Sequence, residues 1–326
     1  MSLIVQPTPS NIKRAVRALM NGDLVGLPTE TVYGLAADAE NEIAVNRVYT
    51  VKGRPRSHPL IVHIGSIEYL DKWAIEIPGY AHELAENFWP GPMTLILKPS
   101  GIAKDFVTGG QYSVGLRIPS HSIALNLLKS FHEHGGNGLA APSANMFGAV
   151  SPTNARSVEI EIGKKMNATS DLILEGGASQ IGLESTIVNC LQSEAQILRP
   201  GAITNFHIEK TLGIKLGKKS ENENIKFSGI FSSHYAPRAT VIYQGKTLEG
   251  DGFLALKNVE TPHGCIRLAK PINSFEFARC LYSVFRMADE RRLHRLFVVL
   301  PVGEGIEVAI ADRVSKASAM KNKLIV

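Results

Sequence analysis

The stretch KGRPRSHPLIVHIG, residues 52–65, joins a basic loop directly to an apolar run. Side chains that carry or can carry positive charge crowd into seven positions of the loop: Lys52, Arg54, Arg56 and His58. Prolines on both sides of Arg56 restrict the backbone, and a rigid display of guanidinium groups suits phosphate oxygens. The run PLIVHI, residues 59–64, predicts a buried strand that carries His63. A solvated basic turn and a satisfied core histidine are the simpler alternatives for these two features.

Strand and helix patterns alternate on both sides of this stretch. Helices are expected at 12–20, after an N-cap at Ser10 and before Gly22, and at 44–49 before Gly53, 80–89 and 122–135. Short apolar runs predict strands at 24–28, 59–64, 93–98, 113–119, 138–144, 172–177, 185–190 and 195–201. Because several strands follow one another, residues 1–212 predict an α/β domain with a mixed sheet rather than a doubly wound one.

The composition changes at residues 213–238, which are rich in Lys, Ser, Asn, Glu and Gly and show little periodicity. This segment predicts a long interdomain linker. In residues 239–326 the alternation restarts, with expected strands at 240–244, 252–257 and 296–302 and expected helices at 275–290 and 307–321. The 326 residues therefore predict two domains, of which the second is a small α/β domain.

The composition, 44% hydrophobic and 20% charged, is that of an ordinary globular protein. No apolar run approaches the roughly 20 residues of a membrane span, and the N-terminal residues lack the pattern of a signal peptide. Cys190, Cys265 and Cys280 are far apart and odd in number, so we expect reduced thiols in a cytoplasmic protein without a membrane partner. The net charge of +5 permits a polyanionic partner such as RNA.

The commonest catalytic and binding motifs are absent from the sequence. The nearest match to GxxxxGK[ST] is GIKLGKKS, whose glycines are one residue too close and whose GK precedes Lys. GxGxxG, HExxH and GxSxG do not occur. His132 and His134 could hold a metal, but a solvated helix end is the commoner explanation. We therefore expect no metal site built by protein side chains.

Hydroxyl, amide and arginine side chains recur at the ends of the expected strands. The segments are PTET (28–31), QYSVGLRIPS (111–120), APSANMFGAVSPT (141–153), GLESTIV (182–188), ILRPG (197–201) and SSHYAPR (232–238). Each alone could be a surface loop. Arg117, however, lies in an otherwise apolar strand, and a buried arginine needs an anionic partner. Together the segments predict a site for a phosphate-bearing ligand and a small carboxylate.

In combination, these segments resemble the Sua5/YrdC family, the threonylcarbamoyl-AMP synthases. The resembling motifs run in the family's order: PTETVYGLAADA, VYTVKGRPRSHPLIVHI, FWPGPMTLILK, VGLRIP, APSANMFGAVSPT, LESTIV and ILRPG. HYAP and the C-terminal domain are similar to the longer form of the family. His58 stands where the family usually has Asn, and the linker departs from the usual sequence before HYAP. The resemblance implies a YrdC-like twisted mixed sheet with flanking helices and a small Rossmann-like C-terminal domain.

The family is a group of nucleotidyltransferases that join L-threonine, bicarbonate and ATP, with Mg²⁺, into threonylcarbamoyl-adenylate and pyrophosphate. A partner transferase then modifies N6 of adenosine 37 in tRNAs that read ANN codons. The threonine-binding residues implied by the resemblance are Thr31, His63, Arg117, Ala141 and Ser185. Those implied around ATP are Arg54, His58, Ser113, Ser143, Ser151, Arg199, His234 and Tyr235. Lys52 and Arg54 are expected to act in catalysis by neutralising charge on the triphosphate.

No residue is an obvious general base, so catalysis is expected to come from positioning and charge stabilisation in a site closed by the linker. A nucleic-acid-binding module without catalysis is an alternative, and it would show salt-sensitive tRNA binding. That alternative does not explain Arg117 within an apolar strand. A structural or partner-binding role for the C-terminal domain is a third hypothesis, because nothing in that domain is typical of a catalytic site.

Overall fold

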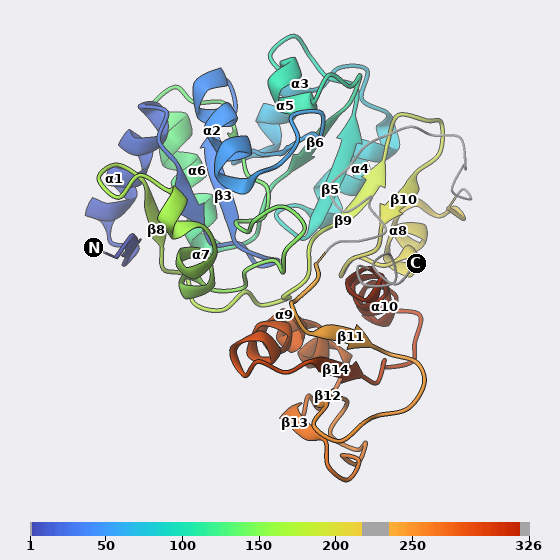
Figure 1. The fold of residues 1–326 in the computed structure, drawn as a ribbon. Coiled ribbons are helices and arrows are strands. Elements are labelled where there is room, and N and C mark those ends of the chain that lie inside the picture. Colours follow the sequence, from blue (N-terminus) through green and yellow to red (C-terminus); the bar gives the residue numbers. More distant parts are fainter. Residues whose placement is uncertain (1, 217–234, 320–326) are drawn as a thin grey trace.

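The computed structural model describes residues 2–216 and 235–319, and its larger part is built on one broad sheet (Figure 1). The sheet has ten strands in the order β1-β8-β2-β3-β7-β4-β6-β5-β9-β10, with both parallel and antiparallel pairs. The strands are β1 (Ile4–Val5), β2 (Val25–Leu27), β3 (Gly34–Asp38), β4 (Ile61–His63), β5 (Met93–Leu97), β6 (Val114–Arg117), β7 (Leu139–Ala140), β8 (Leu172–Leu174), β9 (Thr186–Asn189) and β10 (Gln196–Arg199). The expected mixed sheet is confirmed.

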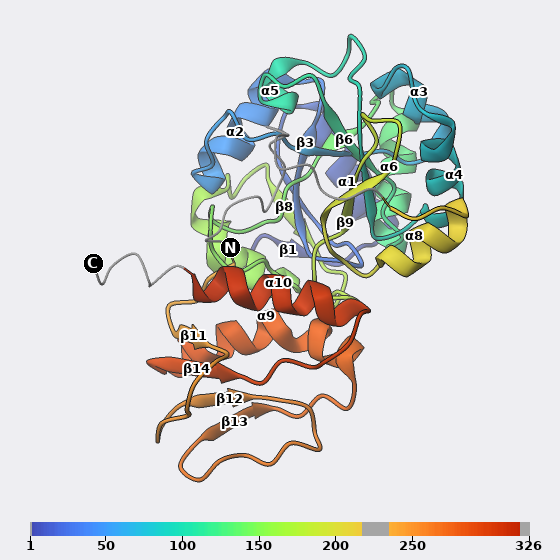
Figure 2. The ribbon, with the colours of Figure 1, turned by 90° about the vertical axis from the view of Figure 1, so that its right-hand side faces the viewer.

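Helices cover both faces of this sheet (Figures 1 and 2). They are α1 (Pro9–Met20), α2 (Glu42–Lys52), α3 (Leu70–Trp73), α4 (Gly79–Phe88), α5 (Asp105–Thr108), α6 (Ser122–Glu133), α7 (Ala155–Ile162) and α8 (Asn205–Leu212). Helices α1 and α6 bury their apolar sides with Val25 on one face. Helices α2, α4 and α7 do so with Leu24 on the other face, as the alternation of side chains along a strand requires.

Helix α1 begins earlier than the sequence predicts. We expected Ser10 to be the N-cap, but the side chain of Thr8 accepts a hydrogen bond from the Asn11 backbone N–H. Pro9 is then the first helical residue, a position where proline loses no hydrogen bond because the N–H would be unpaired anyway. Helix α2 ends at Gly53 as expected, where φ is +62°, a conformation that favours glycine.

Six of these helices and strands were not predicted: β1, β3, α3, α5, α7 and α8. Strand β1 has only two residues, and β3 is the small-residue sequence GLAAD, which has no apolar alternation. Helix α8 buries only Ile208, so its apolar period is too weak to recognise. Helix α7 has eight residues. Such short elements take their stability from tertiary packing, which the local sequence does not display.

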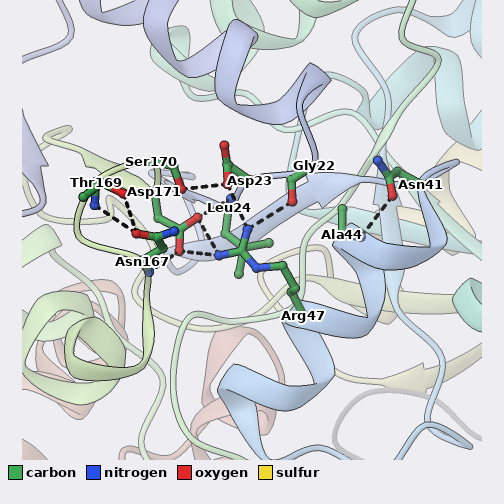
Figure 3. A network of polar contacts seen from close by, with 10 residues as sticks. All are labelled: Gly22, Asp23, Leu24, Asn41, Ala44, Arg47, Asn167, Thr169, Ser170 and Asp171. Atoms are coloured by element: carbon green, nitrogen blue, oxygen red, sulfur yellow. Dashed lines mark hydrogen bonds and ion pairs between the residues drawn. The ribbon is translucent and has the colours of Figure 1, made fainter.

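A network of polar contacts fastens α2 to two loops of the sheet (Figure 3). The Arg47 guanidinium lies 2.9 Å from both carboxylate oxygens of Asp171 and 3.1 Å from Asp23 Oδ1. Asp171 also accepts hydrogen bonds from the backbone N–H groups of Leu24 and Asn167. The segments before β2 and before β8 are therefore held together by one helical side chain.

The smaller part has a parallel sheet in the order β11-β14-β12-β13. Its elements are β11 (Thr240–Ile242), β12 (Gly252–Leu254), β13 (Ile266–Ala269), α9 (Ser274–Glu290), β14 (Arg295–Val298) and α10 (Ile306–Ser318). Strand β13 was not expected, whereas the small α/β domain is confirmed. Helices α9 and α10 lie between this sheet and the larger part (Figure 2). Their apolar side chains share a cluster with Val32, Val150 and Leu183 of the larger part.

Most of the expected linker, residues 217–234, lies outside the described residues. Across the ranges 2–216 and 235–319, no helix has both the length and the apolar character needed to cross a membrane. The three cysteines have free thiols, and that of Cys190 is buried.

Candidate functional site

An open pocket lies where β4 and β6 end and β9 begins, and we call it the cavity. Its lining is Thr29, Thr31, Val32, Gly34, Ile61, His63, Arg117, Ala141, Pro142, Ser143, Glu184, Ser185, Arg199 and Tyr235. All five residues implied for threonine are in this set, together with three of those implied for ATP: Ser143, Arg199 and Tyr235. The polar segments that are far apart in the sequence therefore meet at one place.

Arg117 has an anionic partner inside the chain. Its Nη2 donates to Glu30 Oε1 at 2.6 Å, its Nη1 to Thr31 Oγ1 at 2.9 Å and its Nε to the Gly91 carbonyl at 3.2 Å. Both charged side chains are buried. The sequence suggested a ligand carboxylate as the anion, and it missed Glu30 although PTET displays that residue between two threonines. A guanidinium has five N–H donors, so these contacts leave two to meet a ligand.

His63 stands beside Arg117, because the two residues are partners in the parallel pairing of β4 and β6. The imidazole is 4% exposed, and its Nδ1 has no hydrogen-bond partner among the described residues. Burial, with the charge of Arg117 adding to it, lowers the pKa of His63 to about 3. The cavity wall thus carries a neutral imidazole rather than a cation at physiological pH.

Ser185 is held at the start of β9 by two buried neighbours. Its hydroxyl shares a hydrogen bond of 2.8 Å with Thr94 Oγ1 and accepts one of 3.1 Å from Arg199 Nη2. Arg199 Nε donates to the Ser185 carbonyl at 3.0 Å. These contacts hold a hydroxyl and a guanidinium side by side, and both residues line the cavity.

Lys52 does not line the cavity; it supports one of its loops. Its Nζ donates to the Ser143 carbonyl and, at 2.6 Å, to the Asn145 carbonyl. Burial, and then the charge of Arg54, lowers the pKa of this fully buried amine well below its usual value. The expected role of Lys52 at the triphosphate stays a prediction; in the structure its amine contacts the segment that carries Ser143.

Arg54 and His58 lie together, outside the cavity lining. Arg54 Nη2 donates to the Pro59 carbonyl at 2.9 Å, and the guanidinium carbon lies 5.8 Å from the centroid of the Phe147 ring. The His58 ring meets the same Phe147 ring edge-on at 5.3 Å. Ser113 is buried and also lies outside the lining. The basic loop therefore gathers around an aromatic side chain from the 141–153 segment.

Two family models match the chain in sequence. One, described as telomere recombination, matches residues 17–201, and the other, described as the C-terminal domain of threonylcarbamoyl-AMP synthase, matches residues 203–319. The first model alone covers more than half of the chain. The chain belongs to the Sua5/YrdC family.

Relatives and solved structures support this membership. Proteins named threonylcarbamoyl-AMP synthase from Pyrococcus abyssi (strain GE5 / Orsay) and Bacillus subtilis (strain 168) are 42% and 40% identical over 235 and 233 residues. These segments are 71% and 70% of this chain and 67% and 65% of the relatives, about two thirds of their length. The crystal structure of P. abyssi Sua5 complexed with L-threonine matches with a TM-score of 0.85 and 34% identity, over 98% of this chain and 97% of that one.

In this member of the Sua5/YrdC family, Ser151, Tyr235 and His234 are the other residues implied for ATP, and of the two that the structure describes only Tyr235 lines the cavity. Ser151 is fully buried and outside the lining, and its hydroxyl donates at 2.6 Å to Oε1 of Glu184, which is part of the lining. Tyr235 is buried against the cavity, whereas His234 lies outside the described residues. Glu184 lines the cavity and was missed, although its place next to Ser185 in GLESTIV was the available signal.

The two histidines of HEHGGNG have structural contacts. His132 Nε2 accepts the Gly65 backbone N–H at 2.9 Å, so its Nδ1 donates to the Gly136 carbonyl at 2.7 Å. Its ring stacks on Tyr69 at 3.7 Å. Within the part of this Sua5/YrdC chain that the structure describes, three or more His, Cys, Asp or Glu side chains gather nowhere in an arrangement suited to a metal.

Proposed function

We propose that the protein is a threonylcarbamoyl-AMP synthase, a nucleotidyltransferase that joins L-threonine, bicarbonate and ATP and releases pyrophosphate. The observation that carries the proposal is the cavity that brings Thr31, His63, Arg117 and Ser185 together. The names of the relatives and the threonine complex of a protein with the same fold add support.

Threonine fits the chemistry of one wall of the cavity. We propose that the remaining N–H groups of Arg117 meet the carboxylate, in a charge-assisted hydrogen bond typically worth about 1.5–3 kcal/mol. The hydroxyls of Thr31 and Ser185 and the unpartnered Nδ1 of His63 supply neutral polar contacts for the amine and the hydroxyl. Ala141 leaves room for the methyl group.

ATP is proposed to bind along the side of the cavity that carries Ser143, Arg199 and Tyr235, with Arg54, His58, Ser113 and Ser151 around it. Arginine forks suit phosphate oxygens because they donate two parallel hydrogen bonds. We propose that Mg²⁺ enters with the nucleotide as part of the substrate, coordinated by phosphate oxygens, where it neutralises charge.

The reaction then needs two bond-forming steps. The threonine amine attacks the carbon of CO₂ and loses a proton to solvent, or attacks bicarbonate, whose C–O bond breaks so that hydroxide leaves with the amine proton as water; either route gives the N-carboxy species. A carboxy oxygen of that species attacks the α-phosphorus of ATP, and the bond to the β-phosphate oxygen breaks to release pyrophosphate. Positioning and charge stabilisation are the proposed sources of rate. His63 is a weak base, because its pKa is lowered to about 3 by burial and by Arg117.

The catalytic roles expected of Lys52 and Arg54 are refined by their contacts. Arg54 keeps the proposed role of stabilising the charge of the leaving pyrophosphate. Lys52 is proposed to act through the 141–153 segment, since its amine holds the carbonyls of Ser143 and Asn145. It is therefore a positioning residue in this proposal.

The product is a mixed anhydride, so a further enzyme must use it before water does. We propose that a tRNA N6-adenosine threonylcarbamoyltransferase is that partner and that it modifies adenosine 37 of tRNAs reading ANN codons. Direct binding of tRNA or another RNA by this chain and a cytoplasmic location belong to the same proposal. The RNA contact rests on the family resemblance and on the net charge of +5, and the location rests on the cysteine content.

The first experiment is mass spectrometry of the product formed from Mg-ATP, L-threonine and ¹³C-labelled bicarbonate. We expect threonylcarbamoyl-adenylate that retains the label, and pyrophosphate release that requires both threonine and bicarbonate. Reactions without threonine, and with the Arg117→Met variant, serve as controls. Pyrophosphate release that does not depend on threonine and bicarbonate together would contradict the proposal.

A further inference from the structure

Glu30 is a buried carboxylate that forms an ion pair with Arg117 of the cavity lining. Its side chain is 3% exposed and does not itself line the cavity. Oε1 accepts the hydrogen bond of 2.6 Å from Arg117 Nη2, and Oε2 has no hydrogen-bond partner among the described residues. A ligand carboxylate at Arg117 would therefore meet a guanidinium whose positive charge is already opposed by one buried anion.

The hydroxyl of Thr31, which also lines the cavity, has a fixed direction. Thr29 Oγ1 donates its only hydrogen to the Val32 carbonyl, so it accepts in its 2.8 Å contact with Thr31 Oγ1. The Thr31 hydroxyl hydrogen is thus used on Thr29. One lone pair of the Thr31 oxygen accepts from Arg117 Nη1 at 2.9 Å, which leaves one more. Thr31 can therefore offer a ligand an acceptor but no donor.

These two features suit the zwitterion of an α-amino acid better than a simple carboxylate. The ammonium of a zwitterion is attached to the carbon next to the carboxylate, so a carboxylate bound at Arg117 brings the ammonium close to the same guanidinium. Like charges repel strongly in a buried site, and the Glu30 carboxylate opposes that repulsion. The remaining lone pair of Thr31 gives the ammonium an acceptor. A monoanion gains from neither feature, and Glu30 repels it.

We propose that Glu30 and Thr29 are positioning residues that make the Arg117 end of the cavity select a zwitterionic amino acid over a monoanion. Glu30 acts through Arg117, because it holds the guanidinium and balances its charge. Thr29 acts through Thr31, because it keeps the hydroxyl oxygen available to the ammonium. This inference rests on the proposed function, and it specifies the form in which threonine binds. The ammonium must lose a proton to solvent before the amine attacks.

The first test measures Kd for three ligands of different charge, by ligand-observed NMR on the full-length wild type and Glu30→Gln. L-Threonine is a zwitterion, 3-hydroxybutyrate lacks its amine and is an anion, and L-threoninamide lacks its carboxylate and is a cation at pH 6.5, below the usual α-amino pKa of about 8. The substitution keeps an oxygen that can accept from Arg117 and removes the negative charge. It should tighten binding of 3-hydroxybutyrate about tenfold, weaken that of L-threoninamide about tenfold and change that of L-threonine less than about threefold.

Asp23→Asn is the matched control for the loss of one negative charge. Asp23 pairs with Arg47 at 3.1 Å and does not line the cavity, and Arg47 keeps Asp171 as a second partner. All three Kd values should change less than about twofold in this variant, because its charge is lost at a distance from the cavity. If Glu30 served only the stability of the fold, Glu30→Gln would weaken all three ligands together instead of moving two of them in opposite directions. The charges of Glu184 and Arg199 in the lining are the same in every protein compared.

Thr29→Val tests the direction of the Thr31 hydroxyl independently. The substitution removes the acceptor of the Thr31 hydrogen, which is then free to point toward the ligand. Binding of L-threonine and L-threoninamide, which share the ammonium, should weaken about fivefold, whereas that of 3-hydroxybutyrate should change less than about twofold. Thr29→Ser keeps the hydroxyl and should bind all three ligands as the wild type does.

The outcomes separate this inference from the proposed function. Binding of 3-hydroxybutyrate that Glu30→Gln does not tighten, including no detectable binding to either protein, overturns the role of Glu30. If Glu30→Gln does not fold, the Thr29 variants decide: weakening confined to the two ammonium ligands supports the inference, and equal weakening of all three overturns it. Wild-type protein that forms threonylcarbamoyl-adenylate while the variants keep its selectivity overturns the inference alone. Wild-type protein that neither binds L-threonine nor forms product overturns both.

Discussion

His63 shows how a neighbouring strand sets the chemistry of one side chain. The sequence placed this histidine in a strand and near threonine by resemblance, and the structure places it in the cavity wall beside Arg117. The partner of Arg117 was not predictable in the same way, because Glu30 is 87 positions away in the chain. A sequence displays the need of a buried arginine for an anion, but only the fold decides which carboxylate supplies it.

Because His63 is buried in its neutral form, acid should destabilise the protein through this residue. The unfolded chain takes up a proton near pH 6.5, whereas the folded chain resists until about pH 3, since burial and Arg117 lower the pKa of His63 to about 3. The unfolded state therefore binds more protons in this window, and the free energy of unfolding falls as pH falls, by about 1.4 kcal/mol per pH unit.

Urea unfolding of the wild type and of His63→Gln at pH 7.5, 6.5 and 5.0 measures this effect. Between pH 6.5 and pH 5.0 the wild type should lose about 2 kcal/mol more stability than the variant, which has no imidazole to protonate. Equal losses in the two proteins would show that His63 is not buried as a neutral group.

Lys52 illustrates what a helix end contributes at the scale of an element. Lys52 is the last residue of helix α2, and Gly53 caps the helix. From this position the Lys52 amine donates hydrogen bonds to the carbonyls of Ser143 and Asn145 in the 141–153 segment. The end of this helix was predictable from glycine and proline. That Lys52 points into the protein and Arg54 lies beside Phe147 was not, because neighbouring residues at a helix end differ in direction by a rotation that the sequence does not display.

Lys52→Met should loosen the 141–153 segment more than it affects any other. The substitution removes the donor of two buried hydrogen bonds, and leaving two such carbonyls unpaired should lower the free energy of unfolding by about 2–4 kcal/mol. Hydrogen–deuterium exchange should show faster exchange in residues 141–153. Lys98→Met is the control, since that lysine forms an ion pair with Glu76 at the surface and should cost less than about 1 kcal/mol. Exchange that rises equally in both variants would contradict the role of Lys52.

At the scale of the whole molecule, the two parts of the chain share an apolar cluster. They are also joined by hydrogen bonds from Arg313 and Tyr282 to the Glu184 carboxylate. Phe277 and Ile310 of the C-terminal domain are in one cluster with Val32, Val150 and Leu183 of the larger part. The sequence predicted two α/β domains from the change in composition. It could not predict that helices α9 and α10 pack against the larger part, because each helix pattern shows which face is apolar but not what covers it.

This shared core predicts that both parts unfold in one cooperative step. Both tryptophans, Trp73 and Trp89, lie in the larger part, so fluorescence reports on that part alone, whereas far-ultraviolet circular dichroism reports on the helices of both. Thermal melts followed by the two signals should have coincident midpoints, and the calorimetric and van't Hoff enthalpies should agree. A circular-dichroism transition that separates from the fluorescence transition would show independent domains.

The register of β4 and β6 has a consequence for insertions and deletions in this chain. His63 and Arg117 face the cavity together because their strands are parallel and the two residues are paired. The loops and helices between Ile64 and Ser113 can change in length without altering that pairing. A single residue added within β4 would instead turn the imidazole to the opposite face of the sheet. The number of residues between His63 and Arg117 can therefore vary. The position of each residue within its strand cannot shift by one, because its side chain would then lie on the other face of the sheet.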